Sequence, residues 1–487
     1  MTRASGSSPF APGCNVSTLG TVYPNSEVEP YVASNPVDTN DLVGVWQQDR
    51  WSSAAAQGQL TAVSSDRGST WTLPAPPPFS HCQGGNATNG GDYDRTSDPW
   101  VTFGPTGDSY QSSLAVSNDQ VTSAILVSKS SDHGQTWGPI ATLRRDDDPH
   151  FLNDKESITA DSLAPNRAYA VWDRLFALDP TNPNSDFFGP IWFARTTNGG
   201  ATWRRAHKIF DPGLDNQTIG NQIVELPDGE LLDVFDLIIQ GNLNVALIRS
   251  PDQGRTWSQP TIVDQEASIG VVDPMDAAPV RTGDIIPEVA VDPRPGTNNV
   301  YLVWQDARFS AGHADQVVFT SSSDGGRTWT PVTRISQDGI LQAFTPMITV
   351  AGNGDIAVTY YDFSFDTPAS PTLDTDYWVT RSTDGGATFQ PRERITPTSF
   401  DMRTAPVARG FFVGDYEGLA PSAQFSPFFA AANSGDLSNP TDVFSTLVHA
   451  PFPTAAATVR RPRAHRAKFA RRSPGHIAAS RRPVRVR

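Results

Sequence analysis

Short apolar runs separated by turns rich in glycine, proline and aspartate recur along most of this chain. The clearest set begins at residues 286–308, IPEVAVDPRPGTNNVYLVWQDAR, where PEVAVD predicts one strand, PRPGTNN a turn and VYLVWQD a second strand. QVVFTSS, residues 316–322, predicts a third strand, and PVTRI, residues 331–335, a fourth. The second strand is apolar on both faces, which a sheet packed between two other sheets requires.

The third and fourth strands are joined by SSDGGRTW, residues 322–329, one of six copies of the pattern S-x-D-x-G-x-T-W. An Asp or Asn oxygen can accept backbone N–H bonds and pin a tight turn. The Gly adopts a φ that a side chain would forbid, and the Trp can pack between sheets. We therefore expect a structural rather than a catalytic role for the six polar residues of these turns, Asp66, Asp132, Asn198, Asp252, Asp324 and Asp384.

Six copies of this pattern resemble the Asp-box, or BNR-repeat, family, which includes the sialidases. The resemblance implies an all-β fold, a β-propeller of four-stranded antiparallel blades. Counting the strand sets gives seven blades, and six is possible if the last unit only completes the first blade. The last unit shows three strands, and residues 15–22 are expected to supply the fourth and close the ring.

We therefore predict an N-terminal arm at residues 1–27, a propeller at residues 28–450 and a basic, disordered tail at residues 451–487. The tail holds eleven Lys or Arg and no acid, so the total charge of −15 leaves −26 (−15 − 11) for the remainder. An acidic body disfavours nucleic acid as the main ligand. The tail is either a solvated extension or an electrostatic tether to nucleic acid or an anionic envelope.

Three sequence features bear on where in the cell the protein is located: transmembrane segments, a signal peptide and the two cysteines. No run is long and apolar enough for a transmembrane segment, and no signal peptide is visible at the start. Cys14 and Cys82 lie in loops rich in proline and glycine, which favours a disulfide over two buried free thiols without excluding the latter. We expect a monomer that is secreted or held at the cell surface.

The candidate functional residues are expected on one face of the propeller. In a four-stranded blade the inner-strand starts and second-strand ends lie opposite the Asp-box turns, around the mouth of the central channel, where a ligand usually binds. The inner strands bring Glu29, Asp98, Glu156, Glu288, Asp415 and Tyr416 there. The second strands end in Asp49, Asp173, Asp236, Asp306 and Asp362, which either serve function or cap each blade against the next one.

The family resemblance implies a Tyr nucleophile, a Glu that activates it, an Asp acid and three Arg residues that bind a substrate carboxylate. On this chain Tyr416 matches the nucleophile, and Asp98 is a further catalytic candidate that could form a carboxylate pair with Glu156 or Glu288. Glu156 or Glu288 is the better partner, because Glu417 follows Tyr416 directly and faces the other way. The binding candidates are Arg95, Arg281 and Arg403, followed by Arg50, Arg174, Arg308 and Tyr93. The first inner strand, VEPYVAS, lacks the Arg that the family places there.

These residues predict a sialidase-like glycoside hydrolase acting on a glycan at the propeller mouth. Whether the protein turns over substrate stays open, because a non-catalytic glycan-binding propeller, with Trp51, Trp100 and Tyr93 stacking on sugars, fits the same pattern. No cofactor is expected, although the acids, for example in residues 153–161, could bind Ca²⁺. Zinc hydrolase and nucleotide-binding motifs are missing from the sequence.

Overall fold

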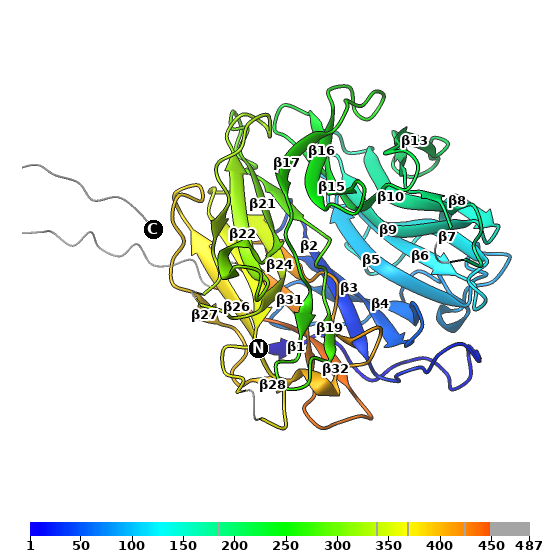
Figure 1. Ribbon diagram of the computed structural model, residues 1–487. Coiled ribbons are helices and arrows are strands. Elements are labelled where there is room, and N and C mark those ends of the chain that lie inside the picture. Colours follow the sequence, from blue (N-terminus) through cyan, green and yellow to red (C-terminus); the bar gives the residue numbers. More distant parts are fainter. Residues whose placement is uncertain (183–184, 338, 368–369, 423–424, 449–487) are drawn as a thin grey trace, which may run out of the picture. The chain divides into compact units, whose positions relative to one another are not determined.

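The computed structural model describes residues 1–182, 185–337, 339–367, 370–422 and 425–448. The described chain forms antiparallel blades arranged around a common centre (Figure 1). Each innermost strand contacts the innermost strand of the next blade, and the last one contacts the first. These strands are β2 (Glu27–Ser34), β5 (Arg95–Phe103), β9 (Phe151–Ala160), β14 (Gln217–Glu225), β20 (Glu288–Val291), β24 (Ala343–Val350) and β30 (Gly418–Pro421). The count of seven blades is confirmed.

Blades 1 to 4 follow the predicted strand order. Blade 1 continues with β3 (Leu42–Arg50) and β4 (Ala56–Ser64), and blade 2 with β6 (Ser109–Val116), β7 (Thr122–Ser130) and β8 (Ala141–Asp147). A single pairing of Ala56 with Thr96 joins these two blades into one sheet. Blade 3 continues with β10 (Ala168–Ala177), β12 (Ile191–Thr196) and β13 (His207–Phe210), with β11 (Phe187–Phe188) beside β10. Blade 4 continues with β15 (Leu231–Ile238), β16 (Asn244–Ser250) and β17 (Thr261–Gln265).

Blades 5 to 7 repeat the order. Blade 5 continues with β21 (Val300–Asp306), β22 (Gln316–Ser322) and β23 (Thr333–Arg334), close to the predicted bounds. Blade 6 continues with β25 (Ile356–Asp362), β26 (Asp374–Ser382) and β27 (Glu393–Arg394), with β28 (Phe400–Asp401) beside β26. Blade 7 consists of β30, β31 (Phe425–Ala432), β32 (Thr441–Ser445) and β1 (Thr2–Arg3). A separate small sheet holds β18 (Val271–Val272), β19 (Pro279–Arg281) and β29 (Phe411–Phe412).

The N-terminal arm closes the ring, but the prediction of which residues do so was wrong. Thr2 and Arg3 pair with Ser445 and Phe444, whereas residues 15–22 run beside blade 1, where Val22 bridges to Trp51. The predicted disulfide between Cys14 and Cys82 is confirmed. It fixes the arm to the loop after blade 1, which keeps residues 15–22 away from blade 7.

The Asp-box turns are structural, as predicted. Asp324 Oδ1 accepts the backbone N–H groups of Arg327 and Thr328, each at 2.8 Å, and Oδ2 accepts the Thr328 hydroxyl at 2.6 Å. Trp329 of this turn packs against the apolar core shared with blade 4. The turn therefore both ends a hairpin and wedges an aromatic ring between two blades.

Most of the second-strand acids accept hydrogen bonds. Asp173, for example, accepts the Thr218 hydroxyl at 2.8 Å and the Gly220 N–H at 3.1 Å, both from the next inner strand. Asp49, Asp306 and Asp362 also accept hydrogen bonds from side chains or backbone N–H groups. Of these four, Asp173 bonds the next inner strand, as the capping interpretation expects, whereas Asp49, Asp306 and Asp362 bond their own blade or the segment before it.

Two further predictions concern a membrane-spanning segment and the basic tail. Among the described residues, no helix has the length and apolar character needed to cross a membrane. The predicted disordered tail, residues 451–487, lies outside the described residues.

Candidate functional site

The inner strands begin with a distortion that repeats from blade to blade. Glu29, Asp98 and Lys155 each have a positive φ, of 51°, 50° and 48°, and Thr345 repeats it in blade 6. At the same points the pairing with the second strand shifts register, as in a β-bulge. Left-handed backbone at residues with a side chain costs about 1 kcal/mol or more each and tends to cluster at functional sites.

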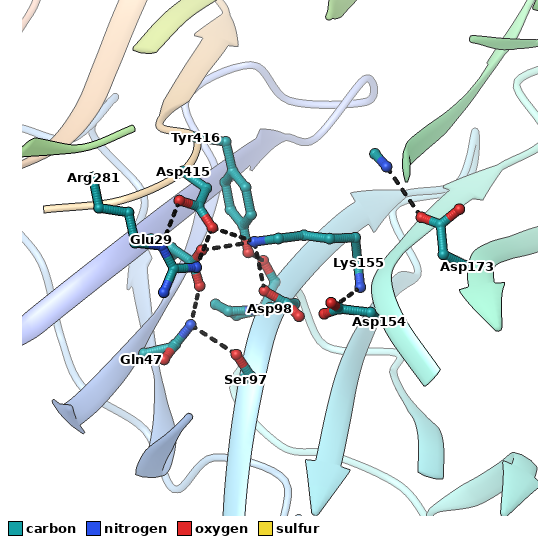
Figure 2. Close-up of polar contacts among 12 residues, drawn as sticks. Glu29, Gln47, Ser97, Asp98, Asp154, Lys155, Asp173, Arg281, Asp415 and Tyr416 are labelled. Carbon is teal, nitrogen blue, oxygen red and sulfur yellow. Dashed lines mark hydrogen bonds and ion pairs between the residues drawn. The ribbon is translucent and has the colours of Figure 1, made fainter. Parts of the chain in front are cut away.

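These bulges place one lysine at the centre of three carboxyl groups (Figure 2). Lys155 Nζ lies 2.9 Å from Glu29, 3.0 Å from Asp98 and 2.7 Å from Asp415. The four residues come from blades 1, 2, 3 and the start of blade 7, and none of their side chains is more than 10% exposed. We call this group the mouth cluster.

Arg281 extends the mouth cluster from the segment between blades 4 and 5. Its guanidinium binds both oxygens of Asp415, and its charged carbon lies 4.2 Å from the Phe412 ring centre. The parallel pairing of β19 with β29 carries Arg281 beside Phe412. On the other side, Gln47 donates to both Glu29 and Ser97 (Figure 2).

The two ends of the mouth cluster differ in charge. Burial raises the pKa of Glu29 to about 8, so this carboxyl is mostly protonated at neutral pH. Burial also acts on Asp415, but Arg281 and Lys155 outweigh it and hold the pKa of Asp415 well below its usual range. The two carboxyl oxygens that bind Lys155 are at most 5.6 Å apart, the sum of their distances to its nitrogen.

Tyr416 lies beside the mouth cluster but is already engaged. Its hydroxyl donates to the Pro99 carbonyl at 3.1 Å, and its ring packs edge-on against Trp100, which stacks on Tyr31. Burial raises the pKa of Tyr416 well above its usual value. Glu417 points away, as predicted, and accepts the Ala430 N–H.

The predicted partners Glu156 and Glu288 are both buried; Glu288 lies beside Gln222, and neither oxygen of Glu156 has a side-chain or backbone donor among the described residues. Burial raises the pKa of Glu288 to about 8 and that of Glu156 well above its usual value. Glu156 lines a cavity of about 10 Å³ together with Trp100, Lys155 and Tyr416. This volume is enough for about one water molecule.

The structure does not bring the three predicted clamp arginines together. Only Arg281 contacts the mouth cluster; Arg95 donates to Asn118, Ser53 and the Leu19 carbonyl, and Arg403 pairs with Asp273. The further binding candidates also have partners within the protein. Arg50 donates to Gln47, and Arg174 pairs with Asp146. Arg308 pairs with Asp306 and Asp264, and Tyr93 is buried beneath Arg145. Trp51 and Trp100, considered for sugar stacking, are also buried.

Lys155 is the residue that sequence reasoning missed. Aligning the inner strands shows the signal, because Glu29-Pro30, Asp98-Pro99 and Lys155-Glu156 occupy the same bulge position.

The ammonium of Lys155 also fills the place that a metal ion would need. Within the described residues, no group of three His, Cys, Asp or Glu side chains is arranged to hold a metal. In residues 153–161, Asn153 bonds to Ser123 and Asp161 to Arg167 and Tyr169.

The described chain is a β-propeller with Asp-box turns and an acidic, ion-paired mouth. The BNR repeat-like domain family matches residues 190–400, which contain four of the six turns, and this confirms the resemblance. No curated protein matches the chain.

Solved structures with a similar arrangement include the Hadza microbial sialidase Hz136, at 15% identity and a TM-score of 0.46, covering 90% of this chain and 91% of that one. The GH93 α-L-arabinofuranosidase of Fusarium graminearum matches at 15% and 0.45, covering 72% and 93%. The α-L-arabinanase of Penicillium chrysogenum matches at 12% and 0.43, covering 89% and 98%. Likenesses at this level carry no argument about the reaction.

Proposed function

We propose that this protein is a sialidase-like glycoside hydrolase that cleaves a glycan at the propeller mouth. The observation that carries the proposal is the pair Glu29 and Asp415, which share one ammonium and have pKa values shifted in opposite directions. Glycosidic cleavage commonly uses one protonated and one ionised carboxyl group, and environments that separate two pKa values assign those roles.

In this proposal Glu29 is the general acid and Asp415 the ionised partner. Retaining enzymes hold the two carboxyl groups about 5–5.5 Å apart, and the upper limit of 5.6 Å between the oxygens on Lys155 is compatible with that spacing. Lys155 and Arg281 orient Asp415 from two sides. Tyr416 is a weaker nucleophile candidate, because its hydroxyl donates to a carbonyl rather than to a base.

The charges at the mouth favour a neutral glycan over an anionic one. Lys155 and Arg281 are already paired with carboxyl groups, so neither cation is left for a substrate carboxylate. The Cys14–Cys82 disulfide supports a place outside the cell, where such bonds persist and glycans are abundant.

The test is turnover on fluorogenic glycosides that include an arabinofuranoside and a sialoside. We expect release by the wild-type protein, loss of at least about 100-fold in Glu29→Gln and Asp415→Asn, and little change in Tyr416→Phe. Lys208→Met, which removes an exposed lysine paired with Asp211, is the matched surface control. Loss in Tyr416→Phe with retention in Glu29→Gln would assign tyrosine chemistry instead.

A glycan-binding propeller without turnover is the second candidate. It is favoured by the fully paired state of Lys155 and by the cavity beside it, which is far smaller than a sugar ring. No release of any sugar by folded protein, together with retention on a glycan array, would establish binding and refute the hydrolase.

A further inference from the structure

One second-strand acid lacks the hydrogen bonds that the others accept. Asp236 lies in the last part of β15, the second strand of blade 4, as Asp49, Asp173, Asp306 and Asp362 do in the second strands of their blades. Those four accept hydrogen bonds, whereas neither oxygen of Asp236 has a donor among the described residues. Asp236 is nevertheless completely buried.

The neighbour of Asp236 is a second buried acid in the same condition. Glu266 follows β17 directly and is 4% exposed, and both of its oxygens also lack a donor among the described residues. The side chains of Asp236 and Glu266 lie within hydrogen-bonding reach of each other. Two carboxyl groups can form that bond only when a proton lies between them.

In the described chain the cation beside the pair, Arg308, donates to the Gln265 carbonyl next to Glu266 and is engaged by other acids. The largest charge effects on the pair from outside it come from Asp284 and Asp306, both acidic. Arg308 is engaged by Asp306 and Asp264, and Arg281 by Asp415. Burial, reinforced by these neighbours, raises the pKa of both Asp236 and Glu266. A pair that must keep a proton is the arrangement expected when like charges are buried together.

Glu266 also begins the segment that supplies Arg281 to the mouth. Residues 267–287 join blade 4 to blade 5, and their first residues are held by acids of blade 5. Ala267 N–H donates to Asp306 at 3.1 Å, and Ile269 N–H donates to Asp315 at 2.9 Å. A repulsion between Asp236 and Glu266 would act at the base of this segment.

We propose that Asp236 and Glu266 share a proton and form a latch that holds residues 267–287, and with them Arg281, in place. While the proton is present, the pair is joined by a hydrogen bond. When it is lost, two buried negative charges face each other and the segment loosens. This device does not depend on the reaction proposed for the mouth cluster.

The direction of the pH effect follows from proton linkage. The folded state keeps a proton that the unfolded or opened state releases above about pH 4, the ordinary value for these groups. The latch therefore stabilises fully below that pH and weakens as the pH rises through the raised folded values. One proton released on opening changes the opening equilibrium up to tenfold per pH unit.

Hydrogen exchange of residues 267–287, read by mass spectrometry and corrected for intrinsic rates, measures this opening. In the wild-type protein we expect protection to fall by up to tenfold per pH unit between pH 6 and 9. The Asp236→Asn/Glu266→Gln variant keeps an amide–amide hydrogen bond without a titrating group, so its protection should stay flat. Asp236→Asn alone, which can donate to Glu266, serves if the double variant does not fold.

Asp49→Asn is the matched control, because Asp49 is the equivalent blade-1 residue and accepts bonds from Asn25 and Gln57. It should leave the pH dependence of residues 267–287 as in the wild type. An equal pH dependence in wild type and double variant would overturn the latch. So would protection of the wild-type segment by added Ca²⁺ that the double variant lacks, since the pair would then bind a cation rather than a proton.

Discussion

Replacement of Lys155 by methionine gives the sharpest test of how the mouth cluster is held. Methionine keeps the length and most of the apolar stem of lysine and removes only the ammonium. Residue 155 has a φ of 48°, and both side chains suffer the same backbone strain there, so that strain cancels in the comparison. The measured difference therefore reports the loss of the contacts to Glu29, Asp98 and Asp415.

The magnitude follows from burial and from what each partner retains. Glu29 keeps Gln47, and Asp415 keeps Arg281, so Asp98 is the carboxyl left without its cation. Its side chain is 3% exposed, which places the cluster among buried rather than surface ion pairs. Removing one partner of a buried pair costs about 3–5 kcal/mol, and the contacts that survive favour the lower end, about 3 kcal/mol.

Chemical unfolding followed by tryptophan fluorescence measures this loss as a shift of the midpoint at unchanged slope. Lys208→Met is the control, because the Lys208–Asp211 pair is exposed and should contribute less than about 1 kcal/mol. Adding Asp98→Asn to Lys155→Met should recover about 1–3 kcal/mol, because the stranded charge disappears. A loss in Lys155→Met no larger than in the control would refute the idea that the ammonium holds four blades together.

Three further outcomes follow. Cys14→Ser should lower the free energy of unfolding by about 4 kcal/mol, because the disulfide spans 68 residues of sequence. Thermal melting of the wild type with and without reductant measures this loss, and an equal melting temperature in both would contradict it. Asp324→Ala should cost about 1 kcal/mol in unfolding, whereas Asp324→Asn should cost less than half of that, since Asn198 already forms the same turn; equal losses would count against the turn bonds. Glu29→Gln should gain stability relative to wild type between pH 5 and 9, because the raised pKa of Glu29, about 8, makes the wild type lose stability as the pH rises through that value; a constant difference across the titration would exclude it.

The fold could be predicted because its repeated turn is formed by residues that are close together in the sequence. The acid, glycine and aromatic of each turn are close in the chain, and their bonds lie within it. The ring closure could not be placed correctly, because Thr2 and Arg3 form a strand only through pairing with β32, more than 400 residues away. Two residues carry no strand pattern of their own.

The sequence predicted on which face of the propeller the candidate site lies, but not which side chains contact each other there. The acids of the inner strands do gather at one end, as strand direction implies. Lys155 was missed because its direction is set by a bulge, a backbone feature that alternation of polar and apolar residues does not reveal. Arg403 was misread for a different reason, since its partner Asp273 comes from a distant segment.

The pairing of β1 with β32 sets the order in which the protein can be assembled. Blades 2 to 6 consist of consecutive strands and can form as each stretch leaves the ribosome. Blade 7 needs Thr2–Arg3 and Phe444–Ser445 at the same time, so β1 stays without its partner strand until almost the whole described chain has been made. If β1 of one chain pairs instead with β32 of a neighbouring chain, the product is an exchanged dimer.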